Sequence, residues 1–161
     1  MNTRTIVRNG ILAALYIAVS AVIQPFGFTN VQFRISEMFN HLIVFNKKYF
    51  FGIVLGVFLT NLLFSPMVAY DLVFGVGQSV ISLLVTILSA KYIKSIIGRM
   101  IVNTVLFTFT MFLIAIELNL AFQLPFWFTW LTTAAGEFIV MAIGIPVMLA
   151  IHKRVNLEKL I

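Results

Sequence analysis

The sequence predicts an all-α membrane protein, a bundle of six transmembrane helices whose N and C termini both lie in the cytoplasm. Three observations point to this fold class. Of the 161 residues, 61% are hydrophobic and only 10% are charged, which is more apolar material than a soluble domain of this size buries in one core. Apolar segments recur at roughly the 20-residue length that crosses a bilayer. Lysine and arginine residues occur in every second connection between these segments.

The first two expected helices differ in length and in polarity. A helix over about 7–24 should end at the sequence QPFG, residues 24–27, because proline stops a helix and glycine permits a turn. A non-helical loop then leads to Arg34. The next helix is short, from about Ile35 to Phe45, and is too polar to face lipid. It is therefore expected to line the interior of the bundle.

Four longer helices complete the bundle, over about 49–64, 70–90, 100–118 and 127–151. A turn containing Ser65 and Pro66 joins the first two of them, and a basic link over 91–99 joins the next two. The chain shows no internal repeat, low-complexity tract or linker, so residues 1–161 are expected to form a single membrane domain.

The orientation follows from the basic residues, because lysine and arginine near helix ends are retained on the cytoplasmic side. Six crossings place ten of the eleven basic residues on that side: Arg4, Arg8, Lys47, Lys48, Lys91, Lys94, Arg99, Lys153, Arg154 and Lys159. Arg34 is assigned elsewhere, and Glu37, Asp71 and Glu117 fall near the outer ends of their helices.

Several classes of function are disfavoured by what the sequence lacks. It has no cysteine and only two histidines, without the spacing of a known metal motif, so neither a thiolate site nor a metalloenzyme is expected. It has no G-x-x-x-x-G-K-[ST] phosphate loop, so any drive by ATP must come from partners. The basic residues lie at segment ends and form no patch for nucleic acid. No activated nucleophile is evident, and we do not expect an enzyme.

Glu137 is the sharpest candidate for a binding residue. An ionisable group inside a bilayer costs about 2.5–3.5 kcal/mol, so its presence needs a reason. Glu137 lies about ten residues into the last helix, roughly 15 Å from its outer end, and should face the interior. Its carboxyl group either ties helices together or contacts a ligand, and we favour the ligand.

Other polar residues are expected at a similar depth. Gln78 follows Asp71 by two turns, and Asn61 lies near the outer end of its helix, so together with Glu137 they can ring a cavity. Glu37 and His41 are four residues apart, which places them on one face of an α-helix, with Arg34 one turn before. This group either binds a polar ligand or forms an internal Arg34–Glu37 ion pair.

Two further features concern surfaces. Trp130, one turn inside the outer boundary, is the preferred residue for stacking on a ring, although tryptophans at this depth are often interface anchors. Gly10, Ala14 and Ala18 recur at intervals of four and leave a smooth helix face. That face either packs inside the bundle or docks on a partner.

The stretch QFRISE, residues 32–37, resembles the signature of QueT-type substrate-binding subunits of energy-coupling factor importers. Three further blocks resemble that family at corresponding places: NLL at 61–63, DLVFG at 71–75, and Gly136–Glu137 followed by GIP at 144–146. The resemblance covers nearly the whole chain. Residues 64–70 depart from the glycine-rich turn that family members often carry, which leaves the identity of the solute open.

The resemblance implies a six-helix S component in the cell membrane of a bacterium, which captures a vitamin-like solute outside the cell. It implies three partners, a transmembrane coupling subunit and two ATPases that bind the ATP, and no cofactor in this chain. Ala14 and Ala18 stand where an Ala-x-x-x-Ala face in such families docks on the coupling subunit. The expected solute is a small heterocycle, either a 7-deazaguanine precursor of queuosine or a vitamin of the hydroxymethylpyrimidine or pyridoxine type.

The chemistry of Glu137 fits the first two of these solutes. A carboxylate accepts two parallel N–H bonds from an amino-pyrimidinone or aminopyrimidine edge, and the Trp130 ring can stack on the heterocycle. The alternative function is a stand-alone, proton-coupled secondary carrier that uses Glu37, Asp71 and Glu137 as a proton relay.

Overall fold

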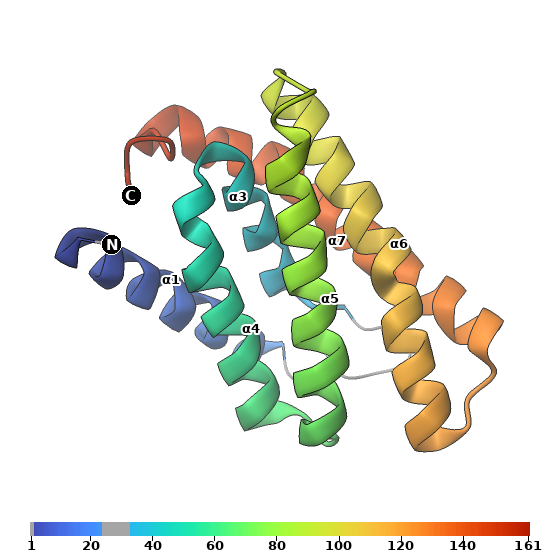
Figure 1. Ribbon diagram of the computed structural model, residues 1–161. Helices are drawn as coiled ribbons and strands as arrows, with labels where there is room; N and C mark the ends of the chain where they lie inside the picture. Colours follow the sequence, from blue (N-terminus) through green and yellow to red (C-terminus); the bar gives the residue numbers. More distant parts are fainter. Residues whose placement is uncertain (1, 24–32) are drawn as a thin grey trace.

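A computed structural model of the chain describes residues 2–23 and 33–161. Within these ranges every regular element is a helix (Figure 1). In chain order they are α1 (Thr3–Val22), the 3₁₀ helix η1 (Ile35–His41), α3 (Leu42–Phe45), the 3₁₀ helix η2 (Lys47–Tyr49), α4 (Phe50–Phe64), α5 (Val68–Ser89), α6 (Ile96–Phe122) and α7 (Phe126–Val155). The all-helical prediction is confirmed.

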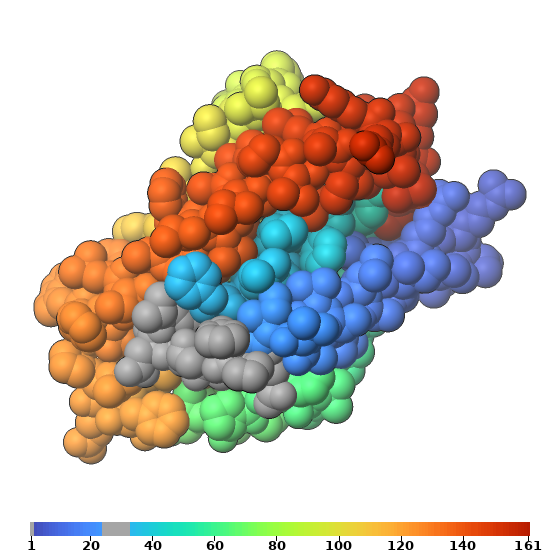
Figure 2. Space-filling view, turned by 180° about the vertical axis from the view of Figure 1, so that it is seen from behind, coloured from blue at the N-terminus to red at the C-terminus, as the bar shows by residue number. Residues whose placement is uncertain are grey.

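The long helices form a bundle around a short central segment. Helices α4, α5 and α6 lie side by side, and α1 and α7 cross them obliquely (Figure 1). The segment η1–α3 packs between α1 and α7, and from behind it is visible between them (Figure 2). The polar segment that was expected to line the interior therefore does so.

Five described helices are long and apolar enough to cross a membrane, where η2 and α4 together (Lys47–Phe64) count as one. The sixth predicted crossing, η1–α3, has seven residues of 3₁₀ helix and four of α-helix. Its length is about 20 Å, short of the roughly 30 Å hydrocarbon core, so it does not span a bilayer by itself. A count of six crossings stays a prediction.

Some helices extend beyond their predicted ends, because the residue that caps the helix lies outside the apolar segment used for the prediction. The first helix begins at Thr3 because the Asn2 side chain accepts a hydrogen bond from the Thr5 amide at 2.9 Å. Helix α6 extends to Phe122, four residues beyond its predicted end at about 118, and Gln123 terminates it in a left-handed conformation. The predicted stop at residues 24–27 lies outside the described residues.

Helices α1 and α4 approach each other closely at two glycines of α4. A Cβ atom at Gly52 would lie 2.6 Å from Asn9 Oδ1, and one at Gly56 would lie 2.7 Å from Tyr16 Cβ. The Gly52 amide donates a hydrogen bond of 2.8 Å to Asn9 Oδ1. The G-x-x-x-G spacing was visible in the sequence, and it marks the contact that fixes α1 against α4.

The distribution of side chains is that of a protein solvated by lipid. Fully buried positions include polar residues such as Asn40, Asn61 and Asn103, while Trp127 and Leu131 are exposed by about 70%. In water such an arrangement would leave a large apolar surface unprotected. In a bilayer it places apolar groups against lipid and polar groups in the interior.

The basic residues other than Arg34 gather at one end of the bundle. The C-terminal segment packs against η2, where the Tyr49 hydroxyl donates to the Leu157 carbonyl at 2.9 Å. The α5–α6 connection lies at this same end, while the α4–α5 and α6–α7 connections lie at the opposite end (Figure 1). This separation agrees with the expected orientation; the cytoplasmic location of the termini stays a prediction.

Candidate functional site

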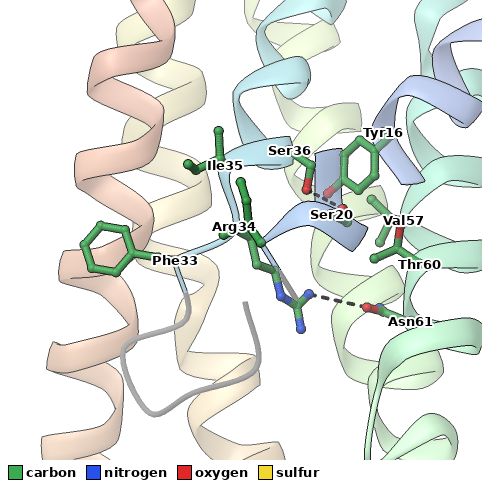
Figure 3. Close-up of a pocket in the computed structure, with 10 residues that line it drawn as sticks. Tyr16, Ser20, Phe33, Arg34, Ile35, Ser36, Val57, Thr60 and Asn61 are labelled. Atoms are coloured by element: carbon green, nitrogen blue, oxygen red, sulfur yellow. Dashed lines mark hydrogen bonds between the residues drawn. The ribbon is translucent and has the colours of Figure 1, made fainter. Parts of the chain in front are cut away.

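A charged pair lies at the centre of the end opposite the basic connections. Arg34, immediately before η1, forms an ion pair with Asp71 of α5, with 3.2 Å between Nη2 and Oδ1. Its Nη1 also donates to Asn61 Oδ1 of α4 at 3.4 Å (Figure 3). The Asn61 amide nitrogen in turn donates to the Asp71 backbone carbonyl at 3.1 Å. Three predicted site residues from three segments thus meet, and Ser65 donates to the second Asp71 oxygen.

Glu37 has different partners from those expected. Its two carboxylate oxygens accept hydrogen bonds from the Tyr16 hydroxyl, at 2.7 Å, and from the Asn40 side-chain amide. The ion pair considered between Arg34 and Glu37 is not the one that forms, since Arg34 pairs with Asp71. A 3₁₀ helix has three residues per turn, which aligns Glu37 with Asn40.

His41 lies away from Glu37, and the expectation that both share one helix face is wrong for the same reason. Its Nε2 lies 2.9 Å from the Met141 carbonyl of α7, and its Nδ1 lies 3.3 Å from the Asn103 amide of α6. The imidazole is fully buried in these contacts. A role for His41 in solute binding stays a prediction.

Glu137 faces the interior of the bundle, as predicted. It is 2% exposed, and its Oε1 atom has no hydrogen-bond partner among the described residues. The charged groups that act on it are Glu37 and Arg34. Glu137 is therefore a buried carboxyl group with one oxygen that lacks a described hydrogen-bond partner.

A second carboxyl group of this kind, Glu117 of α6, was not among the predicted site residues. It is 1% exposed, and no described donor bonds to either of its oxygens. The Asp71 carboxyl group lies within hydrogen-bonding reach of it, so that one protonated carboxyl can donate to the other, and Arg34 lies nearby. The sequence signal was present, because a carboxyl group in an apolar run needs a reason. Placing the helix end at about 118 assigned Glu117 to the boundary, whereas α6 continues to Phe122.

Two other predicted site residues are engaged elsewhere. Gln78 of α5 donates from Nε2 to the Phe107 carbonyl at 3.3 Å and to Thr110 Oγ1 at 3.2 Å, which joins it to α6. The Trp130 indole N–H donates to the Phe109 carbonyl at 3.2 Å, and its ring lies edge-on to Phe109. Solute contact by either residue stays a prediction.

A narrow pocket opens beside Arg34 (Figure 3). Its polar lining comes from Tyr16, Ser20, Ser36, Thr60 and Asn61 as well as Arg34. Its volume is about 10 Å³, room for one water molecule. A heterocycle would have to displace side chains in order to enter it, because ligand sites typically measure about 300–1,000 Å³.

The comparison with protein families decides the class of the protein. The model of the QueT transporter family matches residues 6–153. The chain belongs to the QueT transporter family. It is also similar to a curated protein named Queuosine precursor transporter QueT, from Lactococcus lactis subsp. cremoris (strain MG1363). The two are 32% identical over 165 residues, which cover 98% of this chain and 97% of that protein. No solved structure matches the chain.

The face of α1 that carries small residues lies on the surface of the bundle. Gly10, Ala14 and Ala18 are all exposed, and a Cβ atom at Gly10 would meet nothing within 4 Å. Packing of these residues inside the bundle, one of the two interpretations considered, is therefore not observed. The face lies on the surface of a transporter with no phosphate loop in its sequence.

Proposed function

We propose that the chain is the substrate-capture subunit, or S component, of an ATP-driven importer of the energy-coupling factor type. It binds a queuosine precursor of the 7-deazaguanine class from the outer side of a bacterial cell membrane. The observation that carries the proposal is Glu137, a fully buried carboxyl group with an unpartnered oxygen in a QueT family transporter. The printed name of the Lactococcus lactis relative supports the class of solute.

The binding chemistry follows from the hydrogen-bonding edge of the solute. A 7-deazaguanine presents a ring N–H and an exocyclic amine side by side, and one carboxylate accepts both bonds. Glu137 accepts this edge, with Trp130 as the stacking ring and Gln78, His41 and Asn61 as further contacts. A hydroxymethyl-aminopyrimidine presents similar donors and is the first competitor, and a pyridoxine-type vitamin the second.

Energy coupling comes from partner subunits. The chain has no phosphate loop, so two ATPase subunits bind the ATP, and a transmembrane coupling subunit transmits their motion. The coupling subunit docks on the exposed face of Gly10, Ala14 and Ala18, where small side chains permit close helix approach. In this arrangement both termini and the basic end of the bundle face the cytoplasm.

Calorimetric titration of the purified chain without ATP tests solute capture. We expect submicromolar binding of a 7-deazaguanine, and weaker or no binding of aminopyrimidines and B6 vitamers. The Glu137→Gln substitution should weaken binding about 10- to 100-fold, the effect of losing hydrogen bonds to a charged group. Glu158→Gln, the same change at an exposed position on the basic end, should have no effect. If none of these heterocycles binds, the proposal is wrong.

Pull-down with the coupling subunit tests the docking face. Ala14→Trp or Ala18→Trp should abolish association and leave solute binding intact, since both side chains lie on the exposed surface of α1. Ala69→Trp, at an exposed alanine of α5, is the matched control and should associate normally. Association that survives both α1 changes would place the coupling subunit on another face.

The alternative is a stand-alone secondary carrier coupled to protons. The observation in its favour is the burial of Glu37, Asp71 and Glu137 in one bundle, since intramembrane carboxyl groups form proton relays in carriers. Liposomes that contain only this chain discriminate the two functions. Solute uptake driven by a pH gradient would establish the carrier, whereas a capture subunit moves no solute without its partners.

A further inference from the structure

The basic end of the bundle contains a pocket that the proposed function does not use. It opens where α3 and η2 meet the end of α5 and the start of α6. Its volume is about 480 Å³, within the range of roughly 300–1,000 Å³ that is typical of ligand sites. The α5–α6 connection, at the end of the molecule opposite the Arg34–Asp71 pair, contributes to its lining (Figure 1). Four basic residues line this basic pocket: Lys47, Lys91, Lys94 and Arg99.

No acidic side chain balances these charges in the described part of the chain. The lining of the basic pocket contains no aspartate or glutamate, and the one ion pair within residues 2–23 and 33–161 joins Arg34 to Asp71. Residues 1 and 24–32 contain no aspartate or glutamate in their sequence. Lys94 Nζ donates to the Lys91 carbonyl at 3.4 Å, a contact that neutralises no charge. The basic pocket is therefore suited to an anion.

Arg99 provides an observation that is independent of the net charge. It lies in the first turn of α6 and is partly buried. Its Nε atom is fully buried and has no hydrogen-bond partner among the residues that the structure describes. A buried donor without an acceptor is costly. The acceptor that matches a guanidinium group best is a carboxylate or phosphate, which takes two parallel N–H bonds.

Membrane topology accounts for only part of this arrangement. Basic residues near helix ends are retained on the cytoplasmic side wherever on the end surface they lie. Lys91 and Lys94 follow the C-terminus of α5, where the helix dipole favours a cation. Neither effect requires Lys47 and Arg99, which belong to other segments, to line the same pocket. Arg4, at the same end of the bundle, satisfies the topology rule as an exposed side chain of α1.

The surroundings of the basic pocket distinguish a lipid from a soluble anion. Apolar side chains, including Phe45 and Ile87, form part of its lining. Leu88 and Ile97, on the same helical turns as Ile87 and Arg99, are exposed on the surface of the bundle. The pocket lies where the apolar spans 68–89 and 96–122 end, which is the depth of the headgroups in a bilayer. A phospholipid can use both the charges and the apolar surface, whereas a soluble anion uses the charges alone.

We propose that the basic pocket binds the phosphate of an anionic phospholipid, with Arg99 and Lys47 contacting the phosphate and the acyl chains lying along α5 and α6. Basic pockets between transmembrane helices on the cytoplasmic side bind such headgroups. The lipid leaves the proposed docking face free, because α1 packs on α4 and η1, whereas elements from α3 to α6 line the pocket. This site is separate from the solute site and does not depend on which solute the protein takes.

Native mass spectrometry of the purified chain in detergent tests the proposal with two lipids that have identical acyl chains. Phosphatidylglycerol is anionic, and phosphatidylcholine is zwitterionic. The anionic lipid should bind at least about tenfold more tightly, the effect of one charge-assisted contact. Glycerophosphoglycerol, the same headgroup without acyl chains, should not displace it when added in excess. Equal binding of the two lipids would overturn the proposal, and displacement by the soluble headgroup would show a site for free phosphate esters instead.

Substitutions locate the lipid on the protein. Arg99→Gln should weaken phosphatidylglycerol binding about tenfold and Lys47→Gln about fivefold, because each removes one basic contact. Arg4→Gln and Lys153→Gln are the matched controls, the same changes at exposed positions of the same end, and should have no effect. An equal loss in the controls would show attraction to the whole basic end and overturn the proposal.

Two further outcomes of these variants are decisive. If Arg99→Gln does not fold, the comparison of Lys47→Gln with Lys153→Gln still decides, because both side chains are exposed. If Arg99→Gln and Lys47→Gln lose association with the coupling subunit while lipid binding is unchanged, the basic pocket is a protein contact and the proposal is wrong.

Discussion

Two largely buried polar regions of this bundle differ in how completely their hydrogen-bonding groups are paired. One is the acid cluster, Arg34, Glu37, Asp71, Glu117 and Glu137. The other is the neutral network, formed by His41, Gln78, Ser82, Thr86, Asn103 and Thr110. In the neutral network each side chain bonds to a neighbour, for example Ser82 Oγ to Thr110 Oγ1 at 2.9 Å and Thr86 Oγ1 to Asn103 Oδ1 at 2.8 Å.

The acid cluster is less complete, because one oxygen of Glu137 has no described donor and Glu117 has only the Asp71 carboxyl group beside it. A satisfied network joins helices and needs nothing further. An unsatisfied one, in a bundle solvated by lipid, has no access to bulk water and is suited to a guest molecule. A buried polar residue in a membrane protein therefore does not by itself indicate a binding site. A buried donor or acceptor that lacks a hydrogen-bond partner is the stronger indication.

The largest effect is expected where the acid cluster loses its cation. Arg34→Met should lower the free energy of unfolding by about 3–5 kcal/mol, since it leaves Asp71 buried without its partner. Unfolding in mixed detergent micelles, followed by circular dichroism, measures the change. The double variant with Asp71→Asn should recover part of the loss, and Arg4→Met, at an exposed arginine, should stay near the wild type. A small effect of Arg34→Met would show that the pair contributes little.

The neutral network should respond less strongly. Thr86→Val removes the hydroxyl that bonds Asn103 Oδ1 and should lower the free energy of unfolding by about 1–2 kcal/mol. Solute affinity should change little, because neither Thr86 nor Asn103 is among the proposed solute contacts. A loss of affinity with unchanged stability would add Thr86 or Asn103 to the binding site.

The smallest effect on stability is expected from a second threonine-to-valine substitution, at Thr60 in the narrow pocket beside Arg34. The Thr60 hydroxyl is buried and has no described partner, so Thr60→Val removes no bond. The free energy of unfolding should stay within about 0.5 kcal/mol of the wild type or rise slightly. A loss as large as that of Thr86→Val would show that Thr60 is satisfied after all. The two threonine variants thus measure the two regions with one chemical change.

Much of the fold was predictable because hydropathy and charge act over whole segments. The apolar runs and the alternation of lysine and arginine predicted the long helices in order, and capping residues such as Asn2 and Ser95 explain why they begin earlier than expected. The 3₁₀ form of Ile35–His41 was not predicted, because the residue types in this segment are compatible with an α-helix as well, and it packs against α1 and α7, which are distant in the sequence. That one difference in helical period separated Glu37 from His41.

The sequence predicted which residues belong to the site better than it predicted which of them contact one another. Arg34, Asn61 and Asp71 were each singled out, but their mutual contacts join three segments that the sequence does not place in space. Glu117 was missed by an error of four residues in one helix end. The close contact of Gly52 with Asn9 was not predicted, because a G-x-x-x-G spacing does not identify the helix that packs on it.

The close contact of α1 with α4 at Gly52 and Gly56 has a practical consequence for following motion. The sequence contains no cysteine, so thiols introduced in pairs would be the sole attachment points for spin labels. A pair at Ile11 of α1 and Leu55 of α4, both exposed, spans two backbones held in direct contact, and its separation should stay constant whether the protein is loaded or empty. This constant distance would serve as an internal reference, and displacement of any other helix would be measured relative to it.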